Sequence, residues 1–436
     1  MDCVETRILT GAKHHPSRPA IVFDRERLTY AQLREAVERR AEQLGPLNGR
    51  PVVFRATPCA GTIVCYLAVH LAGGVCVPLD KDAPDCAVQR ANALLAAATI
   101  PPGVADVLFT TGTTGTPKGV MVGHGALLAN SENLIGAQGY APGLTFAVNG
   151  PLNHIGSLSK IAPTLMAGGT VRVTNGMKHI TDFLRSIGDA PHKAATFLVP
   201  ASIRMLTAFA ADSLATLKDK IDFLETGAAP MAQSDMERLG ALLPHSRLYN
   251  TYASTETGVI ATFDFNAGEC LAGCVGHAMR HSAFHVSAEG MVVCAGRTLM
   301  TGYLGDKSAT ERVLRGGELH TADCGTVDDK GRLLLQGRKD DVINAGGYKV
   351  SPVEVENAAL AVPFVKDCAC VPFAHPVTGT ALRLLVVADK AQYDRRQLVS
   401  ALRERLEPHK LPQDIRLTQR IERTFNGKID RKRYLG

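Results

Sequence analysis

Short apolar runs alternate with amphipathic segments as far as about residue 268, and this alternation constrains the fold more than any other feature. The runs that we interpret as strands are 20–23, 52–54, 75–78, 107–110, 170–173, 196–199 and 223–226. The clearest helix starts after Thr29, which forms a capping box with Gln32 and is followed by Leu33 and Val37 on one face. Strands that alternate with helices predict an α/β fold with largely parallel sheets.

Beyond residue 268 the pattern changes to shorter β-rich pieces, at 284–286, 291–294 and 333–336. The charged stretch 337–341 has no apolar periodicity, and after it Ser351 opens a helix as N-cap, with Glu354 closing a capping box. Strands at 367–371 and 382–388 and a helix near 393–406 complete a small α+β unit. We therefore predict an N-terminal domain over 1–339, made of mixed sheets with a β-rich subdomain, and a small mobile C-terminal domain over 340–436.

The composition is that of a soluble globular protein, with 45% apolar and 21% charged residues. The formal net charge of +6 gives no argument for a nucleic-acid partner. We see no signal-peptide pattern and no apolar run long enough to span a membrane, and therefore expect a cytoplasmic protein without a membrane partner. The 11 cysteines are scattered without zinc-site spacing, which predicts buried free thiols in a reducing compartment.

A loop rich in Thr, Gly and Lys follows the predicted strand at 107–110, and residues 108–120 read LFTTGTTGTPKGV. Glycine lets backbone N–H groups approach a ligand, hydroxyls donate hydrogen bonds and Lys118 adds a positive charge. This phosphate loop (108–120) is not a Walker P-loop, because Pro117 precedes Lys118 and Gly119 follows it. The loop predicts a nucleotide-phosphate site outside the common NTPase fold.

Three further segments carry polar side chains suited to a nucleotide. The segment NTYASTETG offers Tyr252 to stack on a base, Thr255 to bind a phosphate and Glu256 to bind Mg²⁺ through its carboxylate. In HTADCG, Asp323 stands before a glycine turn and can accept hydrogen bonds from two ribose hydroxyls. Lys428 lies on an Asn-Gly turn near the end of the chain. Each has an ordinary structural explanation alone (a helix-start carboxylate, an Asx turn, a solvated tail), but their joint occurrence in this order favours function.

Taken together, these segments resemble the superfamily of adenylate-forming enzymes, which includes acyl- and aryl-CoA ligases, nonribosomal peptide adenylation domains and firefly luciferase. ETGAAP at 225–230 is similar to the adenine-side loop of that family, TYASTETG to its aromatic-x-x-Thr-Glu motif, and NGKID to its terminal lysine motif. The block HTADCGTVDDKGRLLLQGRKDDVINAGGYKVSPVEVE resembles the family's ribose, hinge and thiolation-loop segment almost without a break. The resemblance covers roughly the whole chain and is closest to stand-alone acyl- and aryl-CoA ligases.

The resemblance implies a role for each matching residue. Adenine would lie against Tyr252, with the neighbouring nucleotide-side positions Gly227, Ala228, Ala229 and Asn250; the β- and γ-phosphates would bind Thr110, Thr111, Thr113, Thr114 and Lys118. Thr255 would bind the α-phosphate, Glu256 the Mg²⁺, Asp323 the ribose, and Arg338 the ribose–phosphate side. Lys428 would bridge the acid and the ribose, Asp340 would be the hinge, and Gly346, Gly347 and Lys349 would enter to line a thiol channel.

The acid pocket is predicted around PLNHIGS at 151–157. His154 matches the Pro-Leu-x-His pattern of acyl- and aryl-CoA ligases, and we count it among the catalytic residues. Amino-acid-activating relatives have an Asp at the position of Ile155, where it pairs with the substrate ammonium, so an apolar residue there argues against an amino-acid substrate. The remaining pocket positions are predicted at Val199, Gly227, Ala228, Asn250 and Val259, which suggests an aryl or small acyl acid. Lys160, in the next helix, is interpreted as a solvated side chain.

The sequence predicts an ATP- and Mg²⁺-dependent ligase that makes an acyl-adenylate and passes the acyl group to CoA. The alternative acceptor is the phosphopantetheine of a separate acyl-carrier protein, and a CoA user would need cations such as Arg280, Arg338, Lys349 and Lys410 for the nucleotide. A non-catalytic AMP-binding protein is disfavoured by intact Lys118, Glu256, Asp323 and Lys428, and no feature supports a luciferase-type oxygenase. The segment 84–107 is shorter than in the family, which bears on a possible homodimer contact or on the CoA surface.

Overall fold

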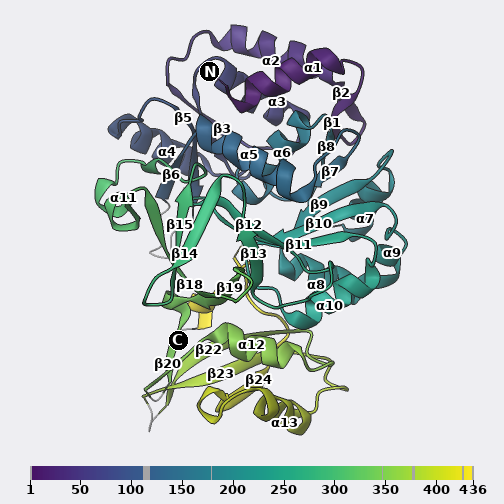
Figure 1. Ribbon diagram of the computed structural model, residues 1–436, viewed down its shortest axis with the longest axis vertical. Coiled ribbons are helices and arrows are strands. Elements are labelled where there is room, and N and C mark those ends of the chain that lie inside the picture. Colours follow the sequence, from purple (N-terminus) through teal and green to yellow (C-terminus); the bar gives the residue numbers. More distant parts are fainter. Residues whose placement is uncertain are drawn as a thin grey trace.

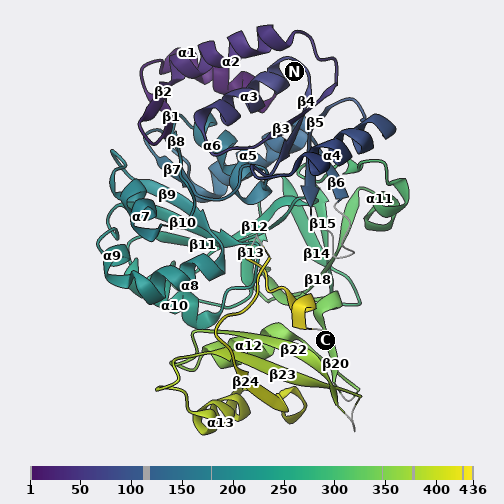
Figure 2. The same ribbon diagram turned by 180° about the vertical axis from the view of Figure 1, so that it is seen from behind.

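The computed structural model describes residues 2–110, 118–177, 179–345, 347–375, 379–424 and 427–434. A large body formed by the first part of the chain stands above a small unit that begins near β20 (Figure 1). Figure 2 shows that the last segment leaves β24 and rises toward β13 before the chain ends near β20. The C-terminal segment therefore lies against the large body and the small unit.

The largest sheet has 14 strands and carries a run of parallel strands at one end and antiparallel strands at the other. The parallel neighbours are, in spatial order, β11 (Arg247–Ser254), β10 (Ile221–Gly227), β9 (Ala194–Leu198), β7 (Thr145–Val148), β8 (Thr170–Val173) and β1 (Pro19–Phe23), with β2 (Glu26–Thr29) antiparallel at the edge. The antiparallel part runs β12 (Gly258–Asp264), β13 (Cys274–Ala278), β19 (Leu333–Arg338), β18 (Glu318–Val327), β15 (Met291–Gly296) and β14 (Ser282–Val286), and β17 (Leu314–Arg315) pairs with β18.

A second sheet of five strands carries the two ends of the phosphate loop. Its order is β16 (Gly302–Tyr303), β6 (Lys118–Gly123), β5 (Val104–Thr110), β4 (Val75–Leu79) and β3 (Pro51–Arg55). Thr110 and Lys118 are paired in the register of the antiparallel β5–β6 hairpin. The segment 84–107 contains α4 (Asp85–Ala97), which connects the parallel strands β4 and β5.

Helices cover both sheets of the large body (Figures 1 and 2). They are α1 (Val4–His14), α2 (Tyr30–Leu44), α3 (Ala60–Leu71), α5 (His124–Gln138), α6 (Ile155–Met166), α7 (Ile180–Gly188), α8 (Pro200–Phe209), α9 (Ala211–Ala215), α10 (Gln233–Leu242) and α11 (Lys307–Val313). The main hydrophobic core lies among α1, α2, α3, α5 and α6, with Tyr30, Leu33 and Phe146 among its fully buried side chains. A second core packs α7, α8 and α10 against the parallel strands.

The small unit has its own hydrophobic core. It contains β20 (Ile343–Ala345), β21 (Tyr348–Val350), α12 (Pro352–Leu360), β22 (Asp367–His375), β23 (Gly379–Val387), α13 (Arg395–Arg405) and β24 (Asp414–Leu417), with short 3-10 turns η1 (Lys339–Asp341), η2 (Pro408–Lys410) and η3 (Arg431–Tyr434). Its contacts with the large body include polar ones: Arg204 on α8 binds Asp367 at 2.7 Å, and the Ser234 hydroxyl donates to the Leu360 carbonyl at 3.0 Å.

The α/β class, each predicted strand and the helix that starts after Thr29 are confirmed, and the Thr29–Gln32 capping box is present. The capping box at Ser351 is wrong. Ser351 is the N-cap of α12, but its hydroxyl donates to the carbonyl of Gln336 at 2.9 Å, and Glu354 instead pairs with Lys410 at 2.7 Å. A backbone carbonyl of β19 accepts from the Ser351 hydroxyl and a lysine of η2 pairs with Glu354, so the capping box does not form.

Candidate active site

The turn between β11 and β12 presents Thr255 and Glu256. Ser254 and Gly258 pair in the hairpin register, and Ser254 and Thr257 exchange hydrogen bonds at 3.0 Å between backbone and hydroxyl groups. Gly258 has φ +67°, and a Cβ there would lie 2.7 Å from the Thr298 carbonyl oxygen, so the turn requires glycine. Thr255 is buried and Glu256 is half-buried on this tight turn.

Asp323 lies on β18 beside two of the predicted nucleotide residues. The Tyr252 hydroxyl donates to its Oδ2 at 2.6 Å, and the Arg338 Nε lies 3.4 Å from its Oδ1. Asp323 and Arg338 are direct cross-strand partners in β18 and β19, which fixes this arrangement through the backbone. Burial, and next the nearby Asp323 carboxylate, raise the pKa of Tyr252, so its hydroxyl stays a donor.

Glu256 is joined to the phosphate-loop lysine through a residue that sequence reasoning missed. The Tyr303 hydroxyl donates to Glu256 Oε1 at 3.1 Å, and the Lys118 Nζ lies 4.7 Å from the centre of the Tyr303 ring. Burial raises the pKa of Tyr303, with the Glu256 carboxylate as the next cause. Tyr303 is on β16, a two-residue strand paired with β6, and no local sequence pattern marked it.

Lys428 enters this site from the C-terminal segment. A Cβ at Gly427, which has φ +81°, would lie 2.9 Å from Val199 Cγ2, so the chain passes in close contact with the start of α8. Burial by surrounding protein atoms lowers the pKa of Lys428, and Arg338 lowers it further, whereas Asp323 and Glu256 oppose the shift. Lys428 nonetheless keeps contact with solvent and is exposed. Lys428 thus lies within electrostatic range of Glu256, Asp323 and Arg338.

The predicted acid pocket begins at α6. His154 is the residue before this helix, and burial lowers its pKa, with Lys428 as the second cause. Ile155 is the first residue of α6 and borders an internal cavity of about 30 Å³ together with Tyr66 and Asp106. Val259, on β12, is buried in the main core. Their contact with an acid stays a prediction.

The end of β10 forms the other side of the predicted pocket. A Cβ at Gly227 would lie 2.6 Å from the Thr251 carbonyl oxygen, so only glycine allows β11 this close. Ala228 has φ +67°, a left-handed conformation that is rare for alanine and costs about 1 kcal/mol or more. Asn250 is buried and donates to the Cys274 carbonyl at 2.8 Å. Strained backbone of this kind clusters at functional sites.

The interpretation of Lys160 as a solvated side chain is wrong. Lys160 is 2% exposed, and its Nζ lies 2.8 Å from Glu225 Oε1 and 2.7 Å from Oε2. The pair lies next to Phe197, whose ring also packs against Gly156 and Gly227. A signal was present, because Lys160 is the one charged residue in the apolar segment 155–166.

The other predicted positions lie outside this cluster or outside the described residues. Asp340 is exposed on η1, and Gly347 and Lys349 are exposed on the β20–β21 hairpin of the small unit. Thr111, Thr113, Thr114 and Gly346 lie outside the described residues. Ala229 follows β10 and is half-buried.

Comparison with known proteins gives one consistent family. Residues 9–100 and 97–304 match the AMP-binding enzyme family, and residues 354–428 match the AMP-binding enzyme C-terminal domain. The chain is 28% identical to a feruloyl-CoA synthase from Amycolatopsis sp and 25% identical to the 2-succinylbenzoate–CoA ligase of Bacillus cereus (strain AH820); each alignment covers 96% of this chain and 95% of the relative.

Solved structures agree with this fold. ATP-bound MatB from Rhodopseudomonas palustris superposes with a TM-score of 0.88 at 23% identity, over 99% of this chain and 98% of that one. The amide bond synthetase McbA from Marinactinospora thermotolerans gives a TM-score of 0.83 at 25% identity, with the same coverage. None of the helices that the structure describes combines the length and the apolar character of a membrane span.

From these matches, the chain belongs to the AMP-binding enzyme family, and its relatives place it among the ATP-dependent acid–thiol ligases.

Proposed function

We propose that this protein uses ATP to convert a carboxylic acid without an α-amine into an acyl-adenylate, and then transfers the acyl group to CoA. The observation that carries the proposal is that Lys428, from the C-terminal segment, lies within electrostatic range of Glu256, Asp323 and Arg338 of the large body. Asp323 and Arg338 lie on strands of the 14-stranded sheet, and Glu256 lies on the turn between β11 and β12 of the same sheet. Lys428 comes from the C-terminal segment that follows β24.

The chemistry of adenylation suits these side chains. A carboxylate attacks the α-phosphorus of ATP, so two anions meet and negative charge spreads over the transition state. Lys428 and Arg338 supply positive charge and N–H donors at that place, and electrostatic stabilisation of this kind is the main requirement of phosphoryl-type transfers. Asp323 orients the ribose by accepting hydrogen bonds from its hydroxyls.

Glu256 fits a Mg²⁺ ion, because a half-buried carboxylate next to a phosphate site is a hard oxygen ligand. Its Oε1 is held by the Tyr303 hydroxyl, which fixes the direction of the carboxylate. Bound Mg²⁺ would neutralise phosphate charge. Lys118, positioned over the Tyr303 ring, adds a second cation on the phosphate-loop side.

The second half-reaction requires the small unit (340–436) to move relative to the N-terminal domain (1–339). Asp340, the first residue of the small unit, is proposed as the hinge of this movement. Lys428 is within electrostatic range of Glu256 and Asp323 in the present arrangement, while Lys349 of the predicted thiolation loop is exposed on the β20–β21 hairpin. Polar contacts such as Arg204–Asp367 hold the small unit in this position, and such contacts exchange with water more easily than a packed apolar interface.

A pyrophosphate-exchange screen over acids tests the proposed activity. Aryl or small acyl acids are expected to drive ATP–pyrophosphate exchange, with thioester formed when CoA is added. Amino acids are expected to be at least about 100-fold poorer, because an unpaired ammonium beside Ile155 costs roughly 3 kcal/mol or more. Robust exchange with an amino acid, or none with any acid, would contradict the proposal.

The acceptor and the assembly are tested in the same preparation. A separate acyl-carrier protein is the alternative acceptor, so product formation is compared between CoA and phosphopantetheinylated carriers. Light scattering tests whether the protein forms a homodimer in solution. We also infer a reducing compartment such as the cytoplasm, because no disulfide joins the cysteines in the part of the chain that the structure describes.

The change Asp340→Pro is expected to spare adenylation and to lower thioester formation by at least tenfold. Proline locks φ near −65°, which suits the 3-10 turn seen at 339–341 but prevents the φ change that a hinge needs. The measurement is exchange and thioester formation on the same protein. Asp340→Ala, which removes the charge but not the freedom, should keep both half-reactions, and a fully active Asp340→Pro would exclude Asp340 as the hinge.

A further inference from the structure

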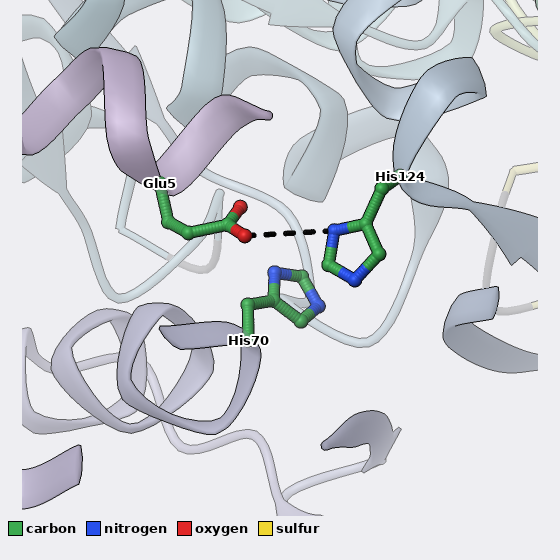
Figure 3. Close-up of side chains that lie close together, drawn as sticks. All are labelled: Glu5, His70 and His124. Carbon is green, nitrogen blue, oxygen red and sulfur yellow. Dashed lines mark ion pairs between the residues drawn. The ribbon is translucent and has the colours of Figure 1, made fainter. Parts of the chain in front are cut away.

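Glu5, His70 and His124 form a buried cluster at the junction of α1, α3 and α5 (Figure 3). Glu5 is 4% and His70 3% exposed, and the His124 side chain is 15% exposed. Their ligand atoms all lie within 4.8 Å of one another. None of the three takes part in the adenylation site described above.

The cluster contains polar atoms that the protein leaves unsatisfied. Glu5 Oε2 and His70 Nδ1 are buried and have no hydrogen-bond partner among the described residues. His124 Nδ1 lies 3.6 Å from Glu5 Oε1, which is beyond hydrogen-bond distance. A buried polar atom without a partner costs roughly 1–3 kcal/mol, so two of them this close together favour a bound ligand.

The Asp106 carboxylate fixes which ring nitrogen of His70 carries the lone pair. Asp106 Oδ1 lies 2.9 Å from His70 Nε2, and Asp106 is itself held by the Tyr66 hydroxyl at 2.8 Å. An Nε2–H that donates to Asp106 leaves Nδ1 as the lone-pair nitrogen of neutral His70. Metal-binding histidines are commonly held by a carboxylate in this manner.

The charge balance points to a cation. Glu5 and Asp106 are both buried, and among the ion pairs of the described residues neither has a lysine or arginine partner. Two buried carboxylates without such a partner are expensive, and a divalent cation offsets both charges. Two imidazole nitrogens and one carboxylate oxygen are a ligand set that Zn²⁺ takes, with water in the fourth position.

We propose that Glu5, His70 and His124 bind a zinc ion that ties α1 to α3 and to the start of α5. The alternative grouping of His70, Cys76 and Asp106 is less suited, because His70 Nε2 already bonds to Asp106 and the Cys76 thiol donates to the Tyr66 carbonyl. His124 directly follows β6 and Asp106 lies on β5, so the ion sits at the end of the hairpin opposite Thr110 and Lys118. It braces the strands that carry the phosphate loop.

The test is metal titration of the full chain after removal of metal with a chelator. Zn²⁺ is expected to bind at one equivalent and to raise Tm, and Co²⁺ is expected to give the visible absorption of a tetrahedral site. His124→Ala should weaken binding at least 100-fold and remove that absorption. His285→Ala is the matched control, because His285 also has a carboxylate nearby, Glu318 at 3.7 Å, but is exposed.

Glu5→Gln provides a second variant of nearly unchanged volume if His124→Ala does not fold, and circular dichroism checks the fold of both. It too should lose the Zn²⁺-dependent rise in Tm. Absence of stoichiometric binding to the unaltered chain would overturn the proposal, leaving a hydrogen-bonded cluster only. Equal binding by the unaltered chain and a folded site variant would also overturn it, by placing the metal elsewhere. These outcomes are independent of the acid-activation proposal, which the exchange assay tests separately.

Discussion

Lys428→Ala is expected to lower acid-dependent ATP–pyrophosphate exchange by at least about 100-fold, the usual effect of removing one donor that stabilises transition-state charge. Lys428, on the C-terminal segment, lies within electrostatic range of Glu256, Asp323 and Arg338. Without it the attacking carboxylate loses the cation that offsets its repulsion from the α-phosphate. Binding of ATP itself should change much less, because Lys118 and Arg338 remain.

Thiolation separates a catalytic role of Lys428 from a structural one. When a synthetic acyl-adenylate and CoA are supplied, Lys428→Ala should form thioester at close to the rate of the unaltered protein, since Lys428 is proposed to leave the site in that step. Lys432→Ala is the matched control, because Lys432 is an exposed lysine four residues away and should leave both steps unchanged. Equal loss of both half-reactions in Lys428→Ala would contradict the role proposed for this lysine.

Much of the fold followed from local sequence patterns. The apolar runs at 20–23, 75–78 and 170–173 became strands because short apolar stretches bounded by turn residues suit buried parallel sheets. Thr29 and Gln32 capped α2 as expected, since a capping box needs only residues three apart. The order of motifs likewise indicated that Glu256, Asp323 and Lys428 act together, although their spacing in the chain says nothing of distance.

What could not be predicted depends on partners distant in sequence. Ser351 stands where an N-cap is expected, but the carbonyl of Gln336 on the neighbouring strand takes its hydroxyl. Tyr303 reaches Glu256 from a short strand that forms only because β6 lies beside it. Lys160 was misread for the same reason: a lone lysine is exposed unless a carboxylate meets it, and Glu225 lies 65 positions further along the chain.

Lys160→Met is expected to lower the free energy of unfolding by about 3–5 kcal/mol, because it leaves the Glu225 carboxylate buried without its partner. Both side chains are almost completely buried, at 3% and 1% exposure, so water cannot replace the lost ammonium. The measurement is urea-induced unfolding followed by circular dichroism. Lys307→Met is the matched control, because Lys307, like Lys160, is a helix residue that pairs with a glutamate, Glu311 at 3.6 Å. Lys307 is 90% exposed, so this variant should change the free energy of unfolding by less than about 1 kcal/mol.

The double variant Lys160→Met/Glu225→Leu decides whether the loss comes from the unpaired charge or from packing. If the cost lies in the buried carboxylate, removing it as well should restore most of the stability, since apolar pairs of similar volume replace buried ion pairs with little loss. If the double variant is as unstable as Lys160→Met, the pair contributes through packing, for example of Lys160 against Phe197, rather than through charge. Recovery of stability without recovery of pyrophosphate exchange would indicate that the ion pair also acts on the predicted acid pocket, because Lys160 Nζ lies 5.4 Å from the centre of the Phe197 ring and that ring lies next to Gly227.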